Sequence, residues 1–89
     1  MWDWDEDKRQ ANLAKHGVDF ADIDRFDWPL ASEWIDVRFD YGEVRKVAVG
    51  TIDARLFVAV FTERGAVRRV ISLRKANERE KRKWSIPAT

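Results

Sequence analysis

The basic residues near the C-terminal end are the part of this sequence best suited to chemistry. Residues 64–83 contain nine Lys or Arg and two acids, whereas residues 1–43 contain five bases and twelve acids. Guanidinium groups bind phosphate oxygens through paired hydrogen bonds and stabilise the charge that develops during phosphoryl transfer. The segment therefore indicates a polyanion or an acidic partner, unless it neutralises the acidic half of the chain within one fold.

The arginines of this segment would be distributed over both faces of a strand. Residues 67–73 read as a strand, and regular alternation continued through it places Arg68 and Arg74 on one face and Arg69 on the other. No register of such a strand hides every arginine, and Arg64 lies near the adjoining turn. The alternative interpretation is an ordinary solvated basic face.

Other chemistries have little support in the residues. His16 is the only histidine, so Ser-His-Asp catalysis could be assembled only around it. It either stabilises the end of a helix or acts as a general acid, a general base or an RNA contact. The chain has no cysteine and no HExxH motif, and we expect neither a metal site nor a cofactor. Most of the five tryptophans are expected in the core or in partner contacts, and only Trp84 is also placed to stack on a base.

Two helices are expected to precede the strands. Asp5 is a good N-cap and Gly17 a good C-terminal residue, which predicts a helix over residues 5–16. Asp19 can cap a second, shorter helix that ends before Trp28-Pro29, because Phe20 and later apolar residues recur every three positions. The two helices would form a helical hairpin.

An antiparallel sheet of three to four strands is expected to follow. Residues 44–52, 56–62 and 67–73 are rich in Val, Ile and Phe, and residues 32–39 form a weaker candidate for an edge strand. The links at residues 53–54 and 63–66 read as turns. Asn77 and Glu80 have capping-box spacing, which predicts a short last helix over residues 78–84. The fold class is therefore α+β.

Length and composition limit the remaining possibilities. A chain of 89 residues has the length of one domain, and we expect a single domain over residues 1–89. The absence of cysteine agrees with a reducing cytosol, and no apolar run approaches the roughly 18 residues that span a bilayer. We therefore expect a cytoplasmic protein that does not contact a membrane.

Two segments form extended signatures, WDxxKxxxNxxKHGxxF from Trp4 to Phe20 and TxRGxxxRVISxRxA from Thr62 to Ala76, with Arg45 and Gly50 between them. Together they resemble the BrnT toxins of type II toxin-antitoxin systems over nearly the whole chain. The resemblance implies a RelE-like fold and a metal-independent bacterial endoribonuclease that arrests translation. It also implies a BrnA-type antitoxin, expected as two toxins with two antitoxins, through which alone the toxin would be linked to DNA.

The resemblance also suggests roles for individual residues. Glu63 or His16 could be the base that activates the ribose 2′-hydroxyl, while Lys8 or an arginine supplies a further positive charge. The phosphate clamps would be Arg64, Arg69 and Arg74. Further RNA contacts are expected from the remaining cations and the last tryptophan, namely Arg68, Lys75, Arg79, Lys81, Arg82, Lys83 and Trp84.

One departure from the family bears on this assignment. Family members tend to have a tyrosine near the end of the last helix, where this chain has Trp84, which cannot exchange an oxygen-bound proton.

Two other functions fit the same residues: a nucleic-acid-binding module without catalysis, and a subunit that binds only an acidic protein partner. Only the enzyme needs a titratable group that converges with the arginines.

Overall fold

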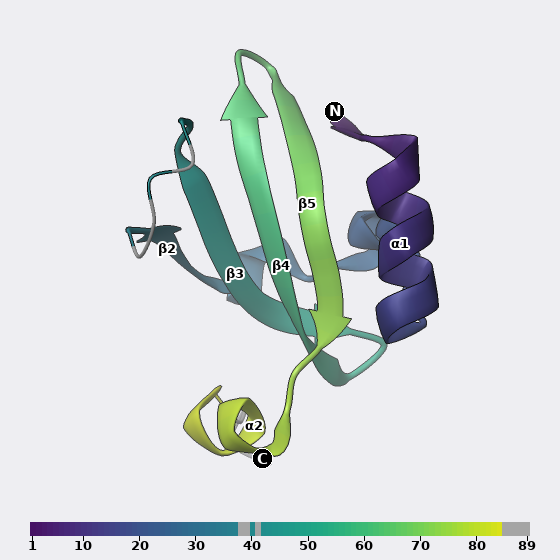
Figure 1. Ribbon diagram of the computed structural model, residues 1–89. Helices are drawn as coiled ribbons and strands as arrows, with labels where there is room; N and C mark the ends of the chain where they lie inside the picture. Colours follow the sequence, from purple (N-terminus) through teal and green to yellow (C-terminus); the bar gives the residue numbers. More distant parts are fainter. Residues whose placement is uncertain (38–39, 41, 85–89) are drawn as a thin grey trace.

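Five strands form one mixed sheet in the computed structural model, which describes residues 1–37, 40 and 42–84 (Figure 1). The strands are β1 (Trp2–Trp4), β2 (Ser32–Asp36), β3 (Arg45–Ile52), β4 (Arg55–Arg64) and β5 (Val67–Lys75), in the spatial order β1-β5-β4-β3-β2. The helices are α1 (Glu6–His16), α2 (Glu78–Trp84) and two 3-10 helices, η1 (Phe20–Arg25) and η2 (Trp28–Leu30). The α+β class and the short C-terminal helix are thus confirmed.

Local capping fixes both ends of α1 and the start of α2. The Asp5 carboxylate accepts hydrogen bonds from the backbone N–H groups of Asp7 and Lys8, and Gly17 ends the helix in the left-handed conformation with φ 69°. At α2 the Asn77 side chain accepts from the Glu80 N–H at 2.8 Å, while the Glu80 carboxylate accepts from the Asn77 N–H at 2.9 Å. The helices predicted over residues 5–16 and 78–84 are therefore confirmed within a residue of their expected bounds.

The strands β3, β4 and β5 form the predicted antiparallel meander. The turn between β3 and β4 has positive φ at Asp53 and Ala54, as a two-residue hairpin loop requires, and Gly65 has φ 62° in the next turn. The strand predicted over residues 32–39 is observed as β2, and residues 38 and 39 lie outside the described residues.

Two features of the predicted fold are wrong. The element after α1 is a 3-10 helix rather than the second helix of a hairpin, although Asp19 does cap it by accepting from the Ala21 N–H. The sheet has five strands rather than three to four, because β1 pairs in parallel with residues 68–70 of β5. A three-residue strand carries too little alternation to be recognised, and its partner lies more than sixty residues away in the chain.

The sheet has two faces of different character. The core face packs against α1, η1 and η2 around Phe20, Ile23 and Phe61, which are fully buried. Gly50 on β3 lies under the Phe26 ring, where a Cβ atom would be 2.7 Å from Phe26 Cζ. We call the opposite face, which carries α2, the cleft face.

A bulge in β5 decides which arginines reach each face. Val60 pairs with Ser72 but Phe61 pairs with Val70, so that Ile71 is an extra residue in β5. The regular alternation expected for this strand is therefore wrong: Arg68 lies on the core face, while Arg69 and Arg74 share the cleft face. The insertion reverses the side-chain direction between the two halves of the strand.

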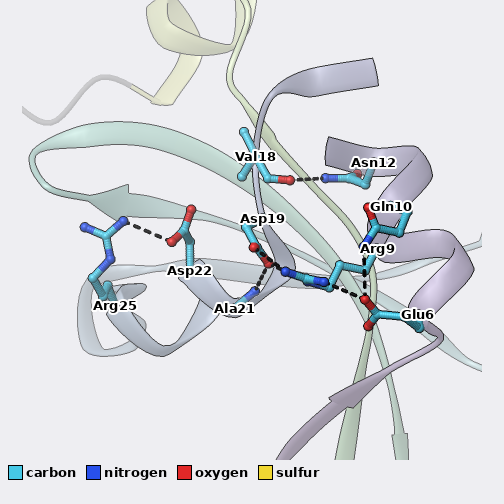
Figure 2. A network of polar contacts seen from close by, with 9 residues as sticks. All are labelled: Glu6, Arg9, Gln10, Asn12, Val18, Asp19, Ala21, Asp22 and Arg25. Atoms are coloured by element: carbon cyan, nitrogen blue, oxygen red, sulfur yellow. Dashed lines mark hydrogen bonds and ion pairs between the residues drawn. The ribbon is translucent and has the colours of Figure 1, made fainter. Parts of the chain in front are cut away.

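The polar side chain of Asn12 joins α1 to the β5 edge below β1. Its amide donates to the carbonyl oxygens of Leu73 (2.8 Å) and Val18 (2.9 Å), and its oxygen accepts from the Leu73 N–H at 3.3 Å. Asn12 thus replaces a neighbouring strand at Leu73 and is itself buried. Figure 1 shows α1 running alongside β5, and Figure 2 shows the contact with Val18.

A second polar contact joins α1 to the start of η1. Arg9 donates from Nε and a terminal nitrogen to the two oxygens of Asp19, at 2.9 and 2.7 Å (Figure 2). These hydrogen bonds lower the pKa of Asp19 to about 2. The bidentate pair therefore ties the loop after α1 to the helix.

Candidate nucleic-acid interface

A row of charged residues crosses the cleft face. The strand registers place Asp3, Arg69, Thr62, Arg45 and Asp36 next to one another on five successive strands. Side chains at such positions point to the same face. Arg69 and Arg45 therefore lie on either side of Thr62, and neighbouring strands are about 5 Å apart. Two arginines that are 24 residues apart in sequence are therefore placed on the same face, two strand spacings from each other.

Carboxylates accompany these guanidiniums without neutralising all of them. Arg69 Nε lies 3.2 Å from an Asp3 oxygen, and Glu43 lies 3.9 Å from Arg45 and 3.6 Å from Arg64. Arg64 belongs to the same face and its side chain is 59% exposed. Because the Arg64 side chain is exposed and its distance to Glu43 is long, its hydrogen-bond donors are available to an anion.

Arg74 is held at the other end of β5 by α2. Its two terminal nitrogens donate to the two Glu80 oxygens at 2.7 and 2.8 Å. These bonds lower the pKa of Glu80 and raise that of Arg74, so both groups remain charged at neutral pH. Because Glu80 also belongs to the capping box, one carboxylate fixes the start of α2 and its position on the sheet.

A cleft of about 340 Å³ lies between α2 and the sheet. Its floor is apolar, and the Trp34 and Trp84 rings stack on each other with centroids 5.4 Å apart and planes 12° apart. Lys83 Nζ lies 5.3 Å from the Trp84 ring. The full lining consists of Trp34, Val47, Val49, Val58, Val60, Arg74, Arg79, Glu80, Lys83 and Trp84.

His16 lies at the C-terminal end of α1, on the side that meets β5. Partial burial lowers its pKa, and the positive charges of Lys15 and Arg74 lower it further. The imidazole is therefore neutral at pH 7 and able to accept a proton. Lys8 and His16 lie one turn before and one turn after Asn12 on the same side of α1, and Lys8 is exposed.

Glu63 and Arg68 lie on the core face, away from the other candidate residues. Glu63 forms an ion pair with Lys46, whose hydrogen bond lowers the pKa of the carboxyl. The Arg68 guanidinium lies 5.5 Å from the Trp2 ring and 5.4 Å from the Trp28 ring. The structure thus brings Arg64, Arg69 and Arg74 to one face and separates them from Glu63 and Arg68 by the thickness of the sheet.

The remaining candidate cations are divided by α2. Arg79 and Lys83 line the cleft, whereas Lys81 and Arg82 are exposed elsewhere on the helix. Lys75 is exposed at the end of β5. Sequence reasoning assigned no role in the site to Arg45 or Trp34. Strand alternation within residues 32–39 and 44–52 was the available signal, but the pairing of β2 with β3 and of β3 with β4 determines which face their side chains join.

Neither a metal-ligand group nor a membrane-spanning helix occurs in the part of the chain that the structure describes. Among residues 1–37, 40 and 42–84, no three His, Cys, Asp or Glu side chains gather in a group that could hold a metal ion. Within the same part of the chain, no helix is long and apolar enough to cross a membrane.

Comparison with known proteins gave one family. A family model described as the ribonuclease toxin BrnT of type II toxin-antitoxin systems matches residues 4–80. This range begins at the last residue of β1 and ends at Glu80. It therefore includes all the residues named above on the cleft face of the sheet, except Asp3. The comparison with curated proteins found no match.

Proposed function

The chain belongs to the BrnT family of ribonuclease toxins of type II toxin-antitoxin systems, and from this premise we propose that it is an endoribonuclease that cleaves RNA on its cleft face. The cleavage needs no metal ion and arrests translation. We further propose that residues 1–89 form one toxin domain with a RelE-like fold. The observation that carries the proposal is that arginines from β3, β4 and β5 lie on one face of the sheet.

The arrangement supports an internal attack within the RNA chain. A base removes the proton of a ribose 2′-hydroxyl, the 2′-oxygen bonds to the adjacent phosphorus, and the bond to the 5′-oxygen breaks. Arg69 and Arg74 stabilise the additional negative charge on the phosphoryl oxygens. Arg64, about 20 Å from Arg74 along the sheet, binds a neighbouring phosphate of the RNA. The products are a 2′,3′-cyclic phosphate and a 5′-hydroxyl, whose oxygen takes up a proton as it leaves.

His16 is the base that the geometry supports best. It lies at the end of α1, the helix that packs against β5, the strand that carries Arg74, and its neutral imidazole can accept the 2′-hydroxyl proton. Lys8, on the same side of α1, stabilises charge on the leaving oxygen. Glu63 is the alternative base, and it would require the RNA to pass around the turn between β4 and β5.

The rest of the RNA follows the basic surface beside this site. We propose that Arg79, Lys83 and Trp84 contact nucleotides at the cleft, and that Lys75 and the exposed cations Lys81 and Arg82 contact the phosphates beyond it. Arg68 lies on the core face, so it could contact the RNA only if the RNA wrapped around the edge of the sheet.

A type II toxin implies an antitoxin partner, and we propose a BrnA-type protein in a complex of two toxins with two antitoxins. The antitoxin carries the DNA-binding function. It neutralises the toxin by covering the cleft-face arginines, which removes the phosphate site. Cleavage at the free-toxin rate by the purified complex would contradict this docking model, and the mass of the complex in solution checks its stoichiometry.

The experiment that tests the activity is incubation of purified protein with RNA in the presence of EDTA, followed by analysis of the product ends. We expect cleavage to persist and to leave 2′,3′-cyclic phosphate or 3′-phosphate ends. Arg74→Ala should lower turnover by about a hundredfold or more, while Arg55→Ala, an exposed arginine of β4 outside the cleft, should leave it unchanged. Loss of activity with EDTA that a divalent ion restores would contradict the metal-free mechanism.

A further inference from the structure

The cleft between α2 and the sheet has two kinds of wall that a single ligand could use together. Five of its lining residues are apolar or aromatic residues of the sheet, and Trp84 of α2 joins them, while the remaining lining residues are three cations and one carboxylate. We propose that this cleft binds one nucleotide of the substrate, with the base against Trp34 and Trp84 and the adjoining phosphate on Arg74, Arg79 and Lys83. The proposal rests on the function proposed above, because it takes RNA as the substrate.

The apolar part of the cleft suits a nucleobase. Val47, Val49 and Val58 form the floor of the cleft on the sheet. Trp34, which stacks on Trp84, is 41% exposed, so part of its ring remains accessible to a ligand. A base has two apolar faces and stacks on aromatic rings whatever its identity. The volume of about 340 Å³ also falls within the roughly 300–1,000 Å³ usual for small-molecule sites.

The charged part of the cleft suits a phosphate rather than an apolar protein segment. Arg74, Arg79 and Lys83 against Glu80 give the lining of the cleft a net charge of +2. A hydrophobic helix placed in the cleft would bury these cations without a counter-charge, which is costly. A phosphodiester beside the base supplies one negative charge to these cations.

Glu80 stands in for the phosphate in the free protein. Its two oxygens bind the Arg74 fork as two phosphate oxygens would, and the capping box keeps it there. An incoming phosphate therefore competes with Glu80 for Arg74. The substitution Glu80→Gln keeps an oxygen for the Asn77 N–H but removes the charge, so it should favour the phosphate without loss of the cap.

The test is a titration followed by NMR of the tryptophan indole N–H groups, with AMP, adenosine and inorganic phosphate as separate probes. We expect AMP to shift the Trp34 and Trp84 signals and to bind more tightly than either adenosine or phosphate. Trp34→Ala should weaken AMP binding by at least about fivefold, the value of one base stack. Glu80→Gln should strengthen the binding of AMP by at least about threefold and leave adenosine unchanged.

Arg79→Gln changes an exposed side chain, so it tests the same site if Trp34→Ala does not fold. It should weaken the binding of AMP but not of adenosine, while Arg55→Ala should change neither. AMP that shifts no cleft tryptophan, or binds Glu80→Gln and the unaltered protein equally, would overturn the proposal. If RNA is cleaved but AMP avoids the cleft, the cleft proposal alone fails. AMP binding in the cleft without RNA cleavage would instead contradict the proposed activity.

Discussion

Replacement of Asn12 by leucine should destabilise the protein far more than its single position suggests. The Asn12 amide pairs with the Val18 carbonyl oxygen and with both backbone groups of Leu73, and it is buried. Leucine has the same branching and the same number of side-chain heavy atoms as asparagine, and a better helix propensity, so neither a cavity nor a weaker helix contributes to the effect. The substitution leaves two carbonyl oxygens and one N–H group without a partner.

The expected magnitude follows from these three groups. A buried polar group that loses its partner costs about 1–3 kcal/mol, which gives a loss of at least about 3 kcal/mol in the free energy of unfolding. For a domain of this size each kcal/mol corresponds to about 4–8 °C in Tm, so Tm should fall by roughly 12 °C or more.

Urea denaturation of the Asn12→Leu variant measures this loss, and Gln10→Leu is the matched control. Gln10 lies on the same helix, is exposed and makes one side-chain hydrogen bond, to Glu6 at 3.2 Å (Figure 2). Its replacement should change the free energy of unfolding by no more than about 0.5 kcal/mol. A loss below 1 kcal/mol at Asn12, or equal losses in the two variants, would refute the view that Asn12 closes the edge of β5.

Three further outcomes are expected. Gly50→Ala should lower the free energy of unfolding by about 1–3 kcal/mol in urea denaturation, because the new methyl group would push Phe26 out of a packed core; an unchanged midpoint would contradict this. Asp19→Asn should cost stability above about pH 4, and its difference from the unaltered protein should vanish as the pH falls through about 2, the pKa of Asp19. The sign follows from a pKa that is lower in the folded state, and a difference that stays constant from pH 5 to pH 2 would contradict it. RNA binding should weaken with salt with a slope of log K against log salt between about −2 and −3.5, which charge reversal at residues 81–83 should reduce in magnitude; a slope near zero would show that the basic segment serves only a protein partner.

The features that local chemistry determines could be predicted from the sequence. The caps of α1 and the capping box of α2 depend on side chains within three residues of the backbone groups that they bind, so the residue types alone identify them. The meander of β3 to β5 is recognisable for the same reason, because consecutive apolar segments are joined by short turns.

The arrangement of the candidate site could be predicted only in part, because it depends on contacts between distant residues. The bulge at Ile71 exists through the pairing of β5 with β4, and it alone places Arg69 and Arg74 on one face. Likewise, the separation of Glu63 from the other candidates follows from the strand register, and the partnership of Arg74 with Glu80 from the way α2 returns to the sheet. Residue types therefore indicate which groups could bind phosphate, but not which of them meet.

The most direct test of an RNA-cleaving cleft face compares two adjacent arginines of β5. Arg69 lies on the cleft face beside Thr62, whereas Arg68 lies on the core face over Trp2 and Trp28. In a single RNA-cleavage assay of folded protein, Arg69→Gln should lower kcat by at least about tenfold, while Arg68→Gln should stay within about threefold of the unaltered protein. A larger loss at Arg68 than at Arg69, with both variants folded, would place the reaction on the opposite face and contradict the account.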